Sequence, residues 1–181
     1  TVDPTNTEAV SLAKLWKQGR ETCLAQIEKT KQLMNEGKFP EASNALVVAK
    51  NLHGLYKPVL DMDSQLGTEW RGWDSKIQND IYQIRNANEK KEFKRALDLV
   101  VKRRAEGKIG PYEQSLAEQE QWARKWETEK EQKRQILKGA EEKTRQYNYA
   151  GALKDFDIGF ADSENLWAAT DPEPNYYTKL R

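Results

Sequence analysis

One pattern occurs three times in the 181 residues and constrains the fold more than any other feature of the sequence. A tryptophan is followed 23 residues later by an aromatic residue, and three positions after that by an alanine. The three sets are Trp16, Phe39 and Ala42; Trp70, Phe93 and Ala96; and Trp126, Tyr149 and Ala152. The copies are 54 and 56 residues apart, and a period of this kind is typical of repeat proteins. We therefore predict an internal triplication in which the three tryptophans are packing residues.

Glycine and proline follow the same period and mark the expected helix ends. Gly37 ends the first long segment, Gly54 and Pro58 follow the first short one, and Gly107 and Pro111 stand at similar offsets in the next copy. These residue types are typical of helix ends and helix starts. Each copy is therefore predicted to be a long helix, a tight turn and a short helix. The expected helices are residues 6–36, 40–52, 59–89, 91–105, 112–146 and 150–163.

The predicted fold is all-α, with three long-helix and short-helix hairpins stacked as a short α-solenoid or as an elongated helical bundle. The hairpins are expected at residues 6–58, 59–111 and 112–166, within one domain of residues 1–166. Apolar residues recur at fixed offsets in all three copies and are expected to form the core. In the third copy residues 127–135 are polar, and Lys133 stands where the other copies have Cys23 and Ile77, so this stretch is predicted not to face a core. Residues 167–181 lack periodicity, contain two prolines and are predicted to be an irregular tail.

The first turn and short helix resemble a known repeat family. The run Gly37-Lys38-Phe39-Pro40-Glu41-Ala42, followed by Leu46 and Ala49, is similar to the second half of a tetratricopeptide motif. The other copies keep less of the motif, because Lys91 and Tyr147 replace the glycine. The copies, of about 55 residues, also exceed the 34 residues of that family. The resemblance implies stacked helical hairpins that bind a protein on a concave face.

Composition excludes several classes of protein. Lys and Arg number 30 against 29 Asp and Glu, so the net charge of +1 argues against nucleic acid or an anionic membrane as the main partner. No run approaches the roughly 18 apolar residues of a membrane span, so we expect a soluble chain without a transmembrane segment. The first residue is Thr1 rather than Met, which we interpret as processing or excision, and both a cytoplasmic and an exported location stay open.

The sequence offers no arrangement of residues typical of catalysis. Cys23 shares an apolar column with Ile77 and is expected to pack, and His53 precedes Gly54 at a helix end, where a capping role or surface exposure is expected. Asp61 and Asp63 fall in the first turn of a helix, where acidic residues complement the helix dipole. With one cysteine, one histidine and no phosphate-binding or nucleophile motif, we predict a non-enzymatic protein without catalytic residues, cofactor or metal.

Charge is distributed unevenly along the chain. Residues 85–108 hold nine basic and four acidic residues, whereas residues 150–174 hold six acidic residues and one lysine. Both segments are interpreted either as solvated faces or as interaction surfaces, the basic helix receiving an acidic partner or the acidic end of another copy. The candidate partner-binding residues are the basic ones and four aromatic ones without counterparts in every copy: Lys90, Lys91, Lys94, Arg95, Lys102, Arg103, Arg104, Trp73, Trp167, Tyr176 and Tyr177.

Three functions fit these observations. The favoured one is a non-catalytic protein-protein interaction or scaffold module that presents a rigid helical surface. The first alternative is a structural subunit of a larger complex, assembled from identical or from different subunits. The lesser alternative is a helical protein that binds nucleic acid or a lipid head group through residues 90–104.

Overall fold

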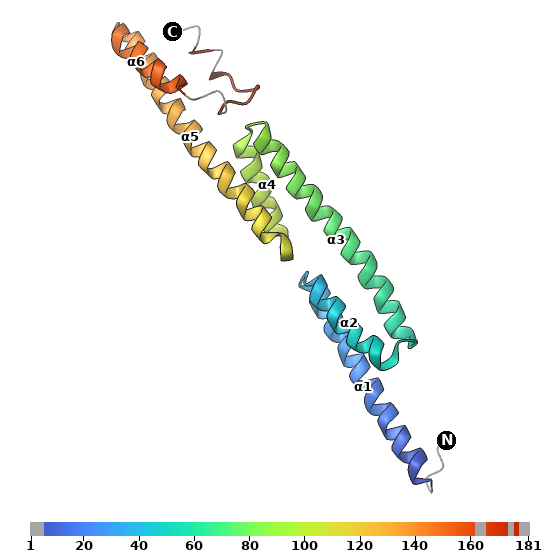
Figure 1. The fold of residues 1–181 in the computed structure, drawn as a ribbon. Coiled ribbons are helices and arrows are strands. Elements are labelled where there is room, and N and C mark those ends of the chain that lie inside the picture. The colour runs from blue at the N-terminus through green and yellow to red at the C-terminus, as the bar shows by residue number, and fades with distance from the viewer. Residues whose placement is uncertain (1–5, 162–165, 174–175, 178–181) are drawn as a thin grey trace. The chain divides into compact units, whose positions relative to one another are not determined.

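The computed structural model describes residues 6–161, 166–173 and 176–177. Within these residues the regular structure is helical and contains no strand (Figure 1), which confirms the predicted all-α class. The helices are α1 (Thr7–Asn35), α2 (Phe39–His53), α3 (Lys57–Glu89), α4 (Phe93–Glu106), α5 (Glu113–Arg145) and α6 (Tyr149–Phe160), with a short 3-10 turn, η1 (Gly110–Tyr112), before α5. The predicted helix limits lie within two residues of these, except at the end of α6, where the predicted residues 162 and 163 lie outside the described part of the chain.

The described residues form two compact units. The first comprises the chain up to Ile77 together with Lys108–Gly110, and the second comprises Gln78–Gly107 and the chain from Pro111 onward. Helix α3 contributes residues to both units. The stacking of three hairpins and the predicted boundaries of the hairpins remain predictions.

The turns that join α1 to α2, α3 to α4 and α5 to α6 have the same backbone structure. Gly37, Lys91 and Tyr147 have φ angles of 74°, 63° and 60°. The next residue in each turn donates its N–H to the carbonyl oxygen five positions earlier, at 2.8 to 2.9 Å, the donors being Lys38, Glu92 and Asn148. This is the Schellman arrangement, in which a left-handed residue ends a helix and satisfies its last carbonyl groups. The left-handed position of such a turn favours glycine, but of these three turns only the α1–α2 turn has glycine there.

The core includes the second half of each long helix and the short helix that follows it, and in the first unit it continues onto the first half of α3 through Val59, Met62 and Leu66. Four of the apolar columns predicted from the sequence are buried, whereas in the column four positions before the repeated tryptophan Leu66 is buried and Leu12 and Trp122 are exposed. The members of the four buried columns are Ile27, Ile81 and Leu137; Thr30, Ile84 and Ala140; Ala42, Ala96 and Ala152; and Leu46, Val100 and Phe156. Through these residues α1 packs on α2, and α5 packs on α6.

The prediction that residues 127–135 face no core is wrong at Lys130. This side chain is only 4% exposed and forms an ion pair with Asp171, from the segment predicted to be an irregular tail. Trp167, from the same segment, is also buried, with the Lys130 ammonium 5.8 Å from its ring centroid. A lysine can be buried when a carboxylate compensates its charge, and the segment after α6 provides that carboxylate.

None of the helices in the described residues combines the length and the apolar character needed to cross a membrane.

Candidate functional site

The basic residues of α4 do not form one free surface. Arg103 is buried, with its guanidinium 3.1 Å from Asp80 and 3.0 Å from Glu106, and it donates a hydrogen bond of 2.6 Å to the Gly107 carbonyl oxygen. Arg104 pairs with Glu113 at 2.5 Å and with Glu120 at 3.1 Å. Its pKa is raised above the ordinary arginine value, mainly by the hydrogen bond with Glu113. Both arginines therefore hold carboxylates of their own chain.

The other predicted basic residues are more accessible but lie at two places. Lys90, Lys94, Arg95 and Lys102 are exposed, Lys91 is half-buried, and Arg95 pairs with Glu92 at 2.7 Å. Because an α-helix rises 1.5 Å per residue, Arg95 and Lys102 are about 10 Å apart along the helix axis. The cations are thus divided between the two ends of α4.

Of the four predicted aromatic residues, Tyr176 is the exposed one. Its hydroxyl donates a hydrogen bond of 3.1 Å to Glu141, which raises the pKa of the phenol. Trp167 and Tyr177 are buried, and burial raises the pKa of Tyr177. Trp73 is half-buried, and its indole nitrogen donates a hydrogen bond of 2.6 Å to the Lys108 carbonyl oxygen. Three of these four aromatic side chains therefore take part in packing.

In the first compact unit the α1–α2 turn is held in an aromatic contact. Phe39 is buried, with its ring centroid 6.3 Å from Trp70 in a stacked arrangement and 4.8 Å from Trp73. Lys108 lies so close to Gly37 that a Cβ atom on the glycine would be 2.6 Å from the Lys108 Cβ. The turn therefore contacts two elements, the aromatic side chains of the next long helix and the segment that follows the next short helix.

In the second compact unit the α3–α4 turn makes the same kind of contact. Phe93 is buried, with its ring centroid 6.4 Å from Trp126 in a stacked arrangement. Lys130 donates a hydrogen bond of 3.2 Å to the Lys91 carbonyl oxygen and also pairs with Asp171, so the segment after α6 completes this contact. Like the α1–α2 turn, the α3–α4 turn has a residue with positive φ and, two positions later, a phenylalanine. This phenylalanine packs on a tryptophan of the following long helix.

Trp16 is exposed, and the prediction that it packs in the core is wrong. Its exposed fraction is 68%, whereas Trp70 and Trp126, at the same position of the other copies, are half-buried. The physical reason is that Trp70 and Trp126 pack on a phenylalanine from the preceding short helix, and no short helix precedes α1 among the described residues.

Trp16 forms one wall of an open cleft of about 640 Å³, which we call the Trp16 cleft. Its lining residues come from α1 and from the end of α2 and the turn after it: Trp16, Arg20, His53, Gly54, Leu55 and Tyr56. Trp16 and His53 have ring centroids 5.2 Å apart, and the Arg20 guanidinium lies 5.7 Å from the Tyr56 ring centroid. Leu55 is 93% exposed at the rim. Aromatic walls with a single guanidinium are typical of sites that bind a side chain of a protein partner.

The α5–α6 turn carries a second exposed aromatic group, which we call the tyrosine turn (residues 147–149). Tyr147 is 80% exposed and Tyr149 is 61% exposed, with their ring centroids 6.3 Å apart. Tyr147 has a positive φ, which is costly for a residue with a Cβ atom. Helix capping explains the left-handed backbone at this position, but neither capping nor core packing explains why the residue is an exposed tyrosine.

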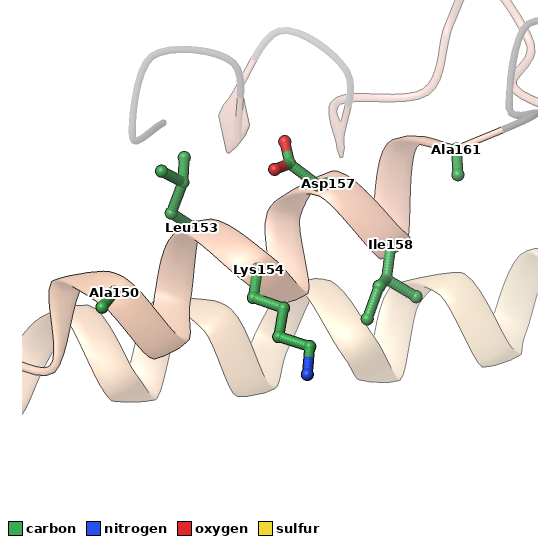
Figure 2. Close-up of a pocket in the computed structure, with 6 residues that line it drawn as sticks. All are labelled: Ala150, Leu153, Lys154, Asp157, Ile158 and Ala161. Carbon is green, nitrogen blue, oxygen red and sulfur yellow. The ribbon is translucent and has the colours of Figure 1, made fainter.

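Helix α6 continues this exposed surface with a shallow depression of about 460 Å³. Figure 2 shows its lining, with Leu153 and Asp157 on one side of the helix and Lys154 and Ile158 on the other. Leu153 and Ile158 are exposed, so the surface next to the tyrosine turn is partly apolar.

Metal-binding side chains and Cys23 are the remaining candidates for chemistry in the described residues. Groups of three His, Cys, Asp or Glu side chains that could bind a metal ion are absent from this part of the chain. Cys23 is fully buried, which confirms its predicted packing role, and burial raises the pKa of its thiol.

The fold defines the chain as an all-α protein. Comparisons with protein families, curated proteins and solved structures found no match.

Sequence reasoning missed the residues of the Trp16 cleft and the tyrosine turn. In the structure Trp70 and Trp126 each stack on the phenylalanine of the preceding copy, whereas Trp16 and Tyr149 make no contact of this kind among the described residues. The spacing of the repeat does not say which copies contact each other, so the sequence alone could not separate Trp16 from the other two tryptophans.

Proposed function

We propose that this protein is a non-catalytic interaction or scaffold module built from three helical-hairpin repeats of tetratricopeptide-like character. Two observations support the repeat assignment. The three turns share one backbone structure, and four apolar columns are buried in all three copies. The protein would bind its partner through rigid aromatic surfaces and would catalyse no reaction.

The observation that carries the proposal is the Trp16 cleft. Phe39 and Phe93 are buried against tryptophan side chains of this chain. Trp16, at the same repeat position as those tryptophans, stays exposed beside Arg20 and Tyr56. Exposed aromatic and arginine side chains in a concave surface are the groups that contribute most to protein-protein affinity.

The alternative of a structural subunit is favoured by a separate observation, the long exposed apolar surface of α1. No residue from Thr7 to Thr22 is buried, although this stretch includes Val10, Leu12 and Leu15. A subunit interface would cover such a surface. The pairing of Arg103 and Arg104 with carboxylates of their own chain speaks against the anion-binding alternative.

A photo-crosslinking amino acid in place of Leu55, at the rim of the cleft, tests the proposed function. We expect a specific protein adduct in an extract of the source cells, and we expect Trp16→Ala to abolish it. Tyr82→Ala is the matched control, because Tyr82 is a similarly exposed aromatic residue outside the cleft. If no adduct depends on Trp16, the interaction function is wrong.

A further inference from the structure

We propose that the Trp16 cleft of one copy of this chain binds the tyrosine turn of a second copy, in a head-to-tail contact. The inference rests on the proposed interaction function and names the partner and the two surfaces. Tyr149 would stack on Trp16 of the neighbouring copy as Phe39 stacks on Trp70 and Phe93 on Trp126 within the chain.

The two internal contacts have nearly the same geometry. The ring centroids of Phe39 and Trp70 are 6.3 Å apart with 20° between the ring planes, and those of Phe93 and Trp126 are 6.4 Å apart with 22°. The contacts lie in different compact units and are made by equivalent residues of the repeat. The chain therefore uses one docking mode twice.

The Trp16 cleft contains the counterparts of Trp70 and Lys108, which lie at the filled contact, whereas the counterpart of Trp73 is Gly19 beside His53. Trp16 lies 54 residues before Trp70, and Gly54 lies 54 residues before Lys108. Lys108 approaches Gly37 and accepts the hydrogen bond of Trp73 in the filled contact. In the cleft these positions line an open volume of about 640 Å³ instead.

The tyrosine turn is equivalent to the turns that fill the internal contacts. Tyr147 and Tyr149 follow Lys91 and Phe93 by 56 residues, and the backbone of the turn is the same. Tyr177 packs on Phe156 of α6 with ring centroids 6.1 Å apart, but Tyr149 keeps 61% of its surface exposed. Tyrosine suits a docking residue that is sometimes exposed, because its ring is apolar and its hydroxyl can stay hydrated.

A contact between two different surfaces leaves one cleft and one turn open in every dimer. Such heterologous contacts continue into chains of copies unless the rotation between copies closes a ring. The wild-type protein is therefore expected to exceed the mass of a dimer as its concentration rises.

Light-scattering mass across about 1 µM to about 1 mM protein, together with complementary variants, tests the proposal. Trp16→Ala removes the cleft wall and keeps the turn, and Tyr149→Ala removes the turn side chain and keeps the cleft. Each variant alone should be monomeric over this range, whereas an equimolar mixture should form a heterodimer and nothing larger. Tyr149→Phe, which restores the residue of both internal contacts, should assemble like the wild type, and so should the control Tyr82→Ala. Circular dichroism should show the same helix content in all variants.

Three results would overturn the inference. The wild type could stay monomeric at every concentration, the mixture of variants could fail to form a heterodimer, or Tyr149→Ala could assemble as well as the wild type. The photo-crosslinking experiment at position 55 distinguishes failure of this inference from failure of the proposed function. An adduct to residues 147–149 of a second copy supports both, an adduct to a different protein supports only the interaction function, and the absence of any Trp16-dependent adduct contradicts both.

Discussion

The ammonium group of Lys130 forms an ion pair with Asp171, and 4% of the lysine side chain and 14% of the aspartate side chain are exposed. Removing the carboxylate with Asp171→Ala leaves a buried cation whose remaining acceptor among the described residues is the Lys91 carbonyl oxygen. Because an uncompensated buried charge is costly, we expect the free energy of unfolding to fall by about 3 kcal/mol, measured by urea denaturation.

The double variant Lys130→Met, Asp171→Leu is the control for this prediction. Replacing both partners of a buried ion pair by apolar residues is often neutral, so the double variant should be more stable than Asp171→Ala alone. If Asp171→Ala unfolds at the same urea concentration as the wild type, the segment after α6 does not hold Lys130 in solution.

Helix positions and core columns could be predicted from the sequence because they depend on local signals. Gly37 and Pro58 mark helix boundaries, and the apolar columns recur at a fixed period. The burial of Lys130 could not be predicted, since its carboxylate partner lies in a segment without periodicity. The exposure of Trp16 could not be predicted either, because residues at one repeat position have different surroundings: Trp70 and Trp126 pack on a phenylalanine of the preceding copy, whereas Trp16 lies beside His53.

Two glycines inside helices are expected to respond in opposite ways to alanine. Gly159 of α6 is buried, and a Cβ atom there would lie 2.5 Å from the Leu137 Cδ2. Gly72 of α3 is exposed, and a Cβ atom there would have no neighbour within 4 Å. Alanine gains about 1 kcal/mol of helix propensity over glycine, whereas overpacking a core costs about 1–3 kcal/mol.

We therefore expect Gly72→Ala to raise the free energy of unfolding by about 1 kcal/mol and Gly159→Ala to lower it by about 1 kcal/mol. Urea denaturation of both variants under one condition measures the difference. A stabilising effect of Gly159→Ala would show that α5 and α6 pack less closely than the structure indicates.

The left-handed turn residues give a second pair of opposite effects. Tyr147→Gly removes a Cβ atom from a residue with φ of 60°, so it should stabilise the fold by about 0.5–1 kcal/mol, after the small loss of the ring contact with Tyr149. Gly37→Ala introduces the same backbone strain and a clash with Lys108, so it should destabilise the fold by about 2 kcal/mol or more. Thermal and urea unfolding of both variants check these signs. A destabilising Tyr147→Gly variant would mean that the tyrosine side chain contributes more to the fold than its exposure indicates.

Glu120 is expected to make stability depend on pH in the acidic range. Its carboxylate accepts hydrogen bonds of 2.9 and 2.6 Å from Arg124 and pairs with Arg104 of α4 at 3.1 Å. The hydrogen bonds from Arg124 are the main cause of a pKa below the ordinary glutamate value of 4.5. Since the folded state then binds the proton less readily than the unfolded state, the contribution of Glu120 is present above about pH 4.5 and is lost as the pH falls through the lowered pKa.

Glu120→Gln should therefore be less stable than the wild type by about 0.5–1 kcal/mol at pH 7, and the difference should shrink toward pH 3. Urea denaturation of both proteins from pH 7 to about pH 3 measures this convergence. In a background with Arg104→Met and Arg124→Met the same substitution should have little effect at pH 7, because its partners are gone. A difference between the wild type and Glu120→Gln that stays constant with pH would show that the glutamate acts through packing and not through its charge.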